Sequence, residues 1–246
     1  RSLADQFTGK LEWFSRTWPL WCEVTSAIAP SQVRVLLVTA MLSSAAGLIL
    51  ELLLVTQASY LAGNATLATG VVVGTFLAAM GLGAWLTEFL AVSTTPRPAL
   101  LRCLVIVELS LCPLCLLGPL VLFQLFAIDG PLWLAVVVLT ILVGVLGGME
   151  LPLITRLLET QQQLRQVLAR VLALDYFGSL LGALAFPLLL LPTLGLLPTA
   201  AALALVPIGC ACWLSWAFDD LRRWRRGTLL AIPLVAVGGY VSIPLG

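Results

Sequence analysis

Long, uninterrupted apolar segments are the feature that most limits how this chain can fold. A run such as "LWLAVVVLTILVGVLGG" (132–148) contains no charged residue, and stretches of comparable length follow one another along the 246 residues. A helix needs about 20 mostly apolar residues to cross the hydrocarbon core of a bilayer, because each residue advances about 1.5 Å. Hydrophobic residues make up 61% of the chain and charged residues 10%, far from the composition of soluble domains. The sequence therefore predicts an integral membrane protein.

The same segments predict helices rather than the strands of a β-barrel. Barrel strands alternate apolar and polar residues over short segments, whereas these segments are continuously apolar, so their backbone groups must bond within each segment. Seven segments are long enough to span: 35–61, 66–91, 100–127, 131–155, 171–192, 194–218 and 227–245. Short connections favour antiparallel neighbours. We predict an all-α, polytopic membrane helix bundle with seven transmembrane helices in residues 35–246.

The positions of the basic residues predict an orientation. All 13 Lys and Arg residues lie before the first span or around the connections between spans two and three, four and five, and six and seven. The other connections, such as "AGNATLA" and "AIDGP", contain none. Because short cytoplasmic loops carry positive charge, the N-terminus is predicted to be cytoplasmic and residue 246 to lie on the opposite side. This topology accounts for the basic residues, so we expect no nucleic-acid partner.

Residues 1–34 are predicted to form a cytoplasmic, interfacial amphipathic segment. In "LEWFSRTWPLWCE" (11–23), aromatic residues alternate with charges, as is typical of a segment in the headgroup region of the bilayer. The segment lacks the short apolar core and cleavage site of a secretory signal. The chain opens with Arg1 rather than Met, and we expect it to be a piece of a longer protein.

Cysteine and histidine content argues against a metal or a cofactor. Five of the six cysteines lie in or beside predicted spans, where a free thiol behaves as a small hydrophobe. "CPLC" (112–115) has the spacing of a redox pair but lacks the βαβ context of such a motif. With no histidine and no clustered ligands, the sequence predicts neither a metal site nor a cofactor.

Glycines at helical spacing predict close contacts between helices. They occur in "GVVVG" (70–74), "GLG" (81–83), "GVLGG" (144–148) and "GSLLG" (178–182). Small residues let helix backbones approach closely in a membrane. We expect tight packing of the spans at 66–91, 131–155 and 171–192, and packing alone accounts for these glycines.

Four carboxylates inside the spans are the candidate ligand-binding residues: Glu51, Glu108, Glu150 and Asp175. A charge at the bilayer centre costs roughly 2.5–3.5 kcal/mol even on the lenient insertion scale, so lipid exposure of all four is implausible. The last three each lie five or six residues from an arginine at the predicted cytoplasmic boundary, which places them at a common depth. Glu51 lies deeper.

Apart from Arg102, at the predicted cytoplasmic end of the third span, no Lys or Arg falls within the spans to neutralise these acids. Clustered carboxylates therefore predict a site for a proton or an organic cation such as a polyamine, whose ammonium groups are separated by methylene spacers. The alternative is that the acids are protonated, or that they accept hydrogen bonds from backbone donors freed near Pro152 and Pro187.

Three stretches carry a resemblance to a known family. They are "SAAGLILELLLVTQASYLAGNATLATGVVVGTFLAAMGLGAWL" (44–86), "GGMELPLITRLL" (147–158) and "ALDYFGSLLGALAFPLLLLPTLGL" (173–196). They resemble the transmembrane region of membrane-bound polyamine aminopropyltransferases, the fused spermidine synthase-like proteins. The resemblance covers most of residues 35–245. It implies a parent protein whose soluble C-terminal domain transfers an aminopropyl group from decarboxylated S-adenosylmethionine to a diamine.

Catalytic residues cannot be assigned from this resemblance. The chain has no strand followed by a glycine-rich nucleotide loop and no acidic cluster in a soluble segment. Whether the protein is an enzyme therefore stays open. A cytoplasmic enzyme after residue 246 requires a further helix, so we expect an eighth helix or a member that lacks the enzyme.

Three functional classes remain open from the sequence. The chain is the membrane anchor of a catalytic parent, a transporter-like bundle with essential acids, or a structural accessory subunit of a larger membrane complex. The partners expected are the lipid bilayer, a polyamine or other organic cation, and another membrane protein or a second copy of the chain. Lipid-facing and partner-facing surfaces are equally apolar, so the sequence does not rank the last class.

Overall fold

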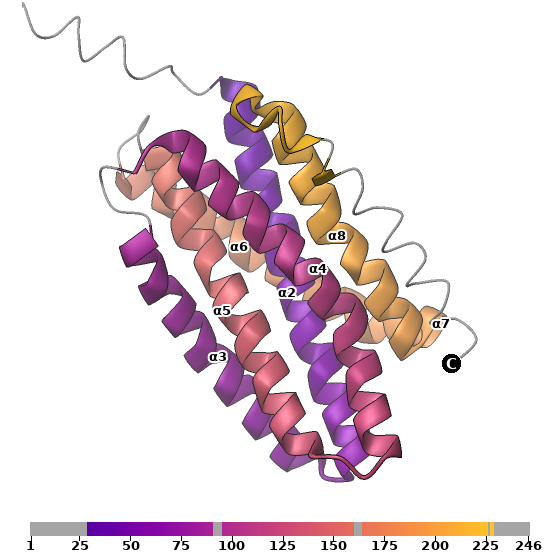
Figure 1. Cartoon of the computed structure of the whole chain (residues 1–246). Coiled ribbons are helices and arrows are strands. Elements are labelled where there is room, and N and C mark those ends of the chain that lie inside the picture. Colours follow the sequence, from indigo (N-terminus) through magenta and orange to yellow (C-terminus); the bar gives the residue numbers. More distant parts are fainter. Residues whose placement is uncertain (1–28, 91–94, 160–163, 226, 229–246) are drawn as a thin grey trace, which may run out of the picture. The chain divides into compact units, whose positions relative to one another are not determined.

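The computed structural model describes residues 29–90, 95–159, 164–225 and 227–228, and all regular structure in these ranges is helical (Figure 1). The elements are α2 (Pro30–Ala62), α3 (Ala65–Leu90), α4 (Arg97–Ala127), α5 (Leu132–Glu159), α6 (Leu164–Ala185), the π-helix η1 (Phe186–Leu190), α7 (Leu191–Leu194), α8 (Leu196–Ala217) and the 3₁₀-helix η2 (Asp219–Leu221). The all-α prediction is confirmed for this part of the chain.

Six helices are long and apolar enough to cross a membrane. They are Pro30–Ala62, Ala65–Leu90, Arg97–Ala127, Leu132–Glu159, Arg165–Leu194 and Leu196–Ala217. Each corresponds to one of the six spans predicted between residues 35 and 218. The first helix begins at Pro30, inside the predicted interfacial segment 1–34. Residues 1–28 and nearly all of the seventh predicted span, 227–245, lie outside the described residues, so both stay predictions.

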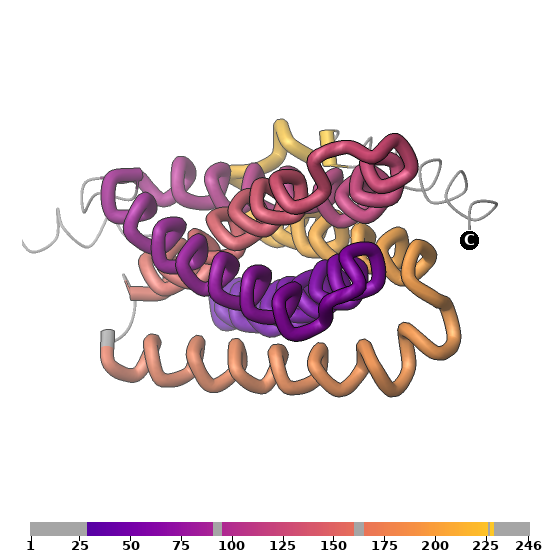
Figure 2. The backbone as a smooth tube through the Cα atoms, turned by 90° about the horizontal axis from the view of Figure 1, so that it is seen from below, coloured from indigo at the N-terminus to yellow at the C-terminus, as the bar shows by residue number. Residues whose placement is uncertain are grey.

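The described helices form an antiparallel bundle in which α5 lies between α3 and α4. It packs against α3 on one side and α4 on another, and α4 also packs along α8. In Figure 2 the rod formed by α6, η1 and α7 runs along the edge of the bundle, with α2 as its neighbour. The hydrogen bond from Ser44 Oγ of α2 to the carbonyl of Asp175 in α6, at 2.9 Å, confirms this neighbourhood.

Glycines bring two pairs of helices into backbone contact. In α5, a methyl group on Gly144 would lie 2.7 Å from the Cβ of Ala79 in α3, and one on Gly148 would overlap the carbonyl of Met80. In α6, methyl groups on Gly178 and Gly182 would meet the backbone of α2. The predicted tight packing is confirmed at these positions. Gly70, Gly74 and Gly81, in contrast, have no neighbour within 4 Å of an added Cβ.

A proline widens the end of the α6 rod. Pro187 has no backbone N–H and its ring crowds the preceding turn, and the backbone adopts a π-helix over Phe186–Leu190 instead of continuing as α-helix. The rod ends at Leu194, and Gly195 reverses the chain with φ 80°, a left-handed conformation that favours glycine. The next residue, Leu196, begins α8.

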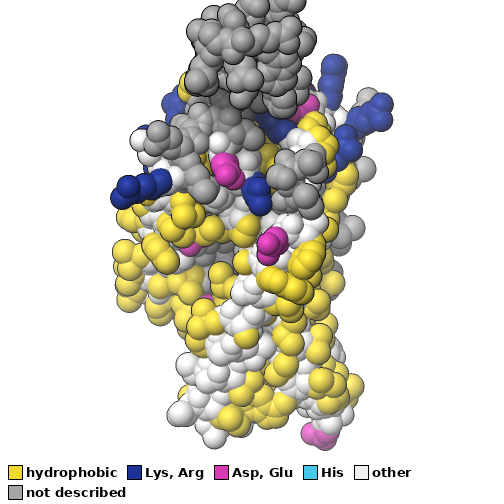
Figure 3. Space-filling model, turned by 90° about the vertical axis from the view of Figure 1, so that its left-hand side faces the viewer, with side chains coloured by type: hydrophobic (Ala, Val, Ile, Leu, Met, Phe, Trp, Pro, Cys, Tyr) yellow, Lys and Arg dark blue, Asp and Glu magenta, His cyan; other side chains and the backbone are white. Residues whose placement is uncertain are grey.

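Basic side chains gather at one end of the described bundle. They lie near the starts of α2, α4 and α6, near the end of α5 and just after α8, and these ends meet because neighbouring helices are antiparallel. On the face seen in Figure 3, Lys and Arg occupy the upper part, and hydrophobic side chains cover much of the rest. The alternation is the one predicted from the sequence, whereas the orientation across a membrane stays a prediction.

Candidate functional site: a buried pair of glutamates

Two of the four predicted acids meet in the core of the bundle. Glu108 of α4 is 0% exposed and Glu150 of α5 is 7% exposed, and the two carboxyl groups interact electrostatically. We call Glu108 and Glu150 the acid pair. No Lys or Arg among the described residues forms an ion pair with either one. The sequence placed both at one depth, and the structure also turns them toward a common interior.

The hydrogen bonding of the acid pair is incomplete. Ser43 of α2 donates its hydroxyl to Oε2 of Glu150. Within the described part of the chain, Oε1 of Glu150 and both carboxyl oxygens of Glu108 have no hydrogen-bond partner. Buried polar atoms are satisfied in the large majority of cases, and an unsatisfied buried group costs roughly 1–3 kcal/mol, more if it is charged. Three such oxygens in one place call for a ligand, a proton or water.

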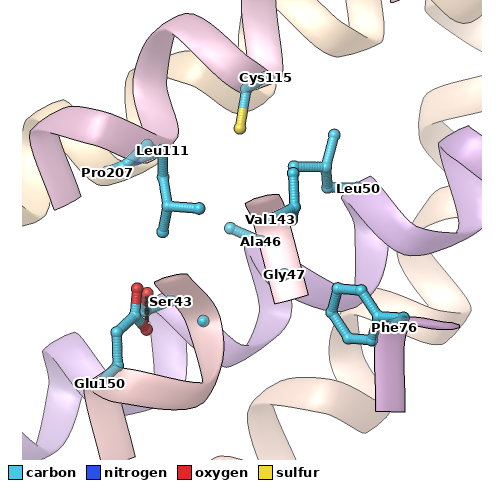
Figure 4. Close-up of a pocket in the computed structure, with 11 residues that line it drawn as sticks. Ser43, Ala46, Gly47, Leu50, Phe76, Leu111, Cys115, Val143, Glu150 and Pro207 are labelled. Atoms are coloured by element: carbon cyan, nitrogen blue, oxygen red, sulfur yellow. Dashed lines mark hydrogen bonds between the residues drawn. The ribbon is translucent and has the colours of Figure 1, made fainter. Parts of the chain in front are cut away.

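A small cavity of about 30 Å³ opens beside Glu150. Figure 4 shows the Glu150 carboxyl group next to Ser43 at one end, with Ala46, Leu111 and Val143 among the apolar residues around the space. A volume of this size has room for about one or two water molecules. Ser43 and Glu150 make the cavity polar at one end and apolar residues surround the rest, whereas Glu108 does not line it.

Two buried thiols lie close to the acid pair. Cys115 of α4 lines the cavity, and Cys210 of α8, which is 2% exposed, lies near the acid pair. The sequence predicted them only as small hydrophobes. In the described ranges, no three His, Cys, Asp or Glu side chains are arranged to hold a metal ion.

Asp175 lies at the edge of the site. It is half-buried on α6 and interacts electrostatically with Glu150. A second serine, Ser44, holds this stretch of α6 against α2, because its hydroxyl bonds the carbonyl of Asp175 at 2.9 Å and Ser179 Oγ at 2.7 Å. Asp175 thus adds negative charge near the acid pair from a separate helix.

Glu51 stands apart from the other acids. It is buried, at 6% exposed, but it has no recorded electrostatic interaction with the acid pair. The structure therefore brings together Glu108 and Glu150, places Asp175 beside them and leaves Glu51 elsewhere. A ligand-binding role for any of the four stays a prediction.

Sequence reasoning missed the serines of α2. Ser43 and Ser44 form a polar dipeptide inside an otherwise apolar helix, and that interruption was the available signal. One alternative from the sequence also loses support. Neither Glu108 nor Glu150 accepts a recorded hydrogen bond from a backbone donor freed near Pro152 or Pro187.

Three curated proteins similar to this chain are all named polyamine aminopropyltransferases. No protein-family model matches the chain, and no solved structure matches it. It is 32% identical over 181 residues to a polyamine aminopropyltransferase of Leptospira interrogans, covering 74% of this chain and 35% of that protein. It is 37% identical over 174 residues to polyamine aminopropyltransferase 2 of Ralstonia nicotianae, covering 70% and 33%.

A longer match is to the polyamine aminopropyltransferase of Corynebacterium efficiens, with 35% identity over 219 residues, or 85% of this chain and 41% of that protein. The chain thus matches well under half the length of these curated relatives. The chain therefore belongs to the polyamine aminopropyltransferase, or spermidine synthase-like, family, and it matches part of the length of these relatives.

Proposed function

We propose that this chain is the membrane-embedded helical region of a spermidine synthase-like protein and that its acid pair binds the ammonium group of an amine. The observation that carries the proposal is the set of three buried, unpartnered carboxyl oxygens on Glu108 and Glu150. In this proposal, regions outside the matched residues carry out aminopropyl transfer, the activity named in the relatives.

Membrane embedding is supported by the exposed surface of the bundle. Many large hydrophobic side chains on the outer faces of α3, α6 and η1 are more than half exposed, including Leu77, Trp85, Tyr176, Leu180 and Leu188. Monomeric soluble proteins rarely expose apolar patches of this extent. Acyl chains of a bilayer would cover these faces, and the basic end of the bundle would lie at the cytoplasmic surface.

An amine suits the acid pair by donor number and by shape. An ammonium group carries three N–H donors; Glu150 offers it one unpartnered oxygen at the cavity, and Glu108, which interacts electrostatically with Glu150, carries two more. Ala46, Leu111 and Val143 would contact the methylene groups that follow the ammonium group. Diamines and polyamines combine these two features, and the names of the relatives point to the same class of molecule.

The size of the cavity limits what enters in this conformation. Room for about one or two waters accommodates an ammonium group and not a whole polyamine. A longer chain would therefore require neighbouring helices to separate. We expect short primary amines to bind without rearrangement and longer diamines to bind with it.

Thermal unfolding of the purified chain in detergent tests the proposal. Methylamine, propylamine, putrescine and spermidine are added at equal ionic strength to the parent and to Glu150→Gln, Glu108→Gln and the control Glu88→Gln. Glu88 is an exposed carboxylate on α3, so its substitution removes the same charge away from the site. A ligand at a hundred times its Kd stabilises the parent by about 2.7 kcal/mol.

The expected result is a rise in melting temperature with amines in the parent and in Glu88→Gln, and no rise in the two acid-pair variants. An equal rise in all four proteins would show nonspecific binding and overturn the amine site. Absence of any rise would do the same and would favour an anchor or an accessory subunit.

A further inference from the structure

We infer that the acid pair holds one proton, shared between Glu108 and Glu150, when no cation is bound, and that an amine entering the cavity displaces this proton. The first half of the inference stands on the burial of the two carboxyl groups and on the shortage of hydrogen-bond donors around them. The second half rests on the proposed function, and the experiments below separate the two.

The donors around the pair are too few for two carboxylates. An ionised carboxylate only accepts hydrogen bonds, so two adjacent ones require donors or cations around them. Among the described residues, the hydroxyl of Ser43 is the single recorded donor; it donates to Glu150 and also lies close to Glu108. One added proton removes one of the two negative charges and turns one carboxyl group into a donor, which relieves both the repulsion and part of the missing hydrogen bonding.

The other groups that face the pair strengthen the demand for a proton. The titratable side chains around it are Asp175 from α6, Cys115 from α4 with Cys112 beside it, and Cys210 from α8. From α2 the pair meets Ser43, and from α3 the cavity receives the ring of Phe76. None of these groups is a cation, and Asp175 adds a further negative charge.

The cavity supplies the second observation beyond the acidic cluster. Oε1 of Glu150 is buried, lacks a partner and belongs to a side chain that lines the space. Figure 4 shows that carboxyl group directed to the end of the cavity where Ser43 lies. A cation placed there would contact an acceptor that no protein donor occupies.

The exchange balances in atoms and in charge. The O–H bond of the protonated carboxyl group breaks, its proton leaves to solvent, and the amine enters with all of its own protons. The acid pair with one proton carries one negative charge, and two carboxylates with one ammonium ion also carry one. The buried region therefore never holds two uncompensated negative charges, whose cost in a medium of low dielectric constant is high.

Infrared spectroscopy of the amine-free protein tests the shared proton. A protonated carboxyl group has a carbonyl stretching band that a carboxylate lacks. Near neutral pH we expect the parent and Glu88→Gln to show this band and both Glu108→Gln and Glu150→Gln to lose one carboxyl group's share of it. Identical bands in all four proteins would overturn the inference. Because Glu→Gln keeps the size of the side chain, folding is checked in each sample by its melting curve.

Calorimetric titration with propylamine in buffers of different ionisation enthalpy tests the exchange in the parent protein alone. Release of one proton per amine predicts an apparent Kd that tightens about tenfold for each unit of rising pH below the point at which the pair loses its proton. Amine binding without proton release, together with no band difference, would overturn the inference and leave the proposed function standing. If the carbonyl band differs between the proteins but no amine binds, the shared proton is supported and the proposed function is overturned.

Discussion

Helix α5 has two faces with different roles. One packs closely against a neighbouring helix, and the other buries a carboxyl group. One face places Gly144 and Gly148 against α3, where backbones touch and the contact is apolar. Another face, only two residues further along, buries Glu150 against α2 and α4 with an oxygen that has no partner. Close packing fully accounts for the first face. The second retains a polar group that packing does not require, and this difference locates the candidate site.

The largest effect is expected at the glycine face. Gly148→Leu would drive a side chain into the backbone of Met80, and we expect a loss of about 3 kcal/mol or failure to fold. The measurement is the melting temperature and the yield of monodisperse protein in detergent. Gly70→Leu is the control, because Gly70 has open space around it. Equal stability of the two variants would contradict the α3–α5 contact.

The acid face should make stability depend on pH. If the folded protein keeps a proton that the unfolded chain releases, stability falls as pH rises, by about 1.4 kcal/mol per pH unit for one proton. We expect this fall in the parent as the pH rises above about 5, and a flatter profile in Glu108→Gln. Melting curves across this range measure it. A parent profile that rises with pH would contradict the difference drawn between the two faces.

The α2–α6 contact combines close glycine packing with a polar hydrogen bond. Substitutions there should have an intermediate effect on stability. It has glycines at 178 and 182 together with the hydrogen bond between Ser44 and Ser179. A double-mutant cycle with Ser44→Ala and Ser179→Ala should give a coupling energy of about 0.6 kcal/mol, the size typical of such bonds between membrane helices. Additive losses would mean that the glycines alone hold α6 in place.

The smallest effect is expected where a glycine has no packing role. Gly74 is exposed in α3, with no atom within 4 Å of an added Cβ. Because Ala favours the helix by up to about 1 kcal/mol over Gly, Gly74→Ala should leave stability unchanged or raise it slightly. A clear drop in melting temperature would reveal a partner on this face. Gly144→Ala, which meets Ala79, should be destabilising in the same assay.

Axial positions were predictable from the sequence, and rotations around helix axes were not. The length of each apolar run and the rise per residue are local properties, so six helices and the common depth of Glu108 and Glu150 followed from counting. The direction in which a residue points depends on packing. These helices are apolar on all sides, so they lack the polar face that reveals rotation in a soluble helix. Glu51 was therefore grouped with acids that it does not meet, and Gly70 and Gly74 with packing glycines.

The reversal at Gly195 has a mechanical consequence. A single residue joins the end of the α6 rod at Leu194 to the start of α8 at Leu196, so the connection contains no slack. A displacement of α6 along its length must pull on α8 or be absorbed in the π-helical turn at Phe186–Leu190. Asp175 on α6 interacts electrostatically with Glu150, so α6 carries a carboxyl group close to the acid pair. A displacement of α6 would therefore change the electric field at the acid pair.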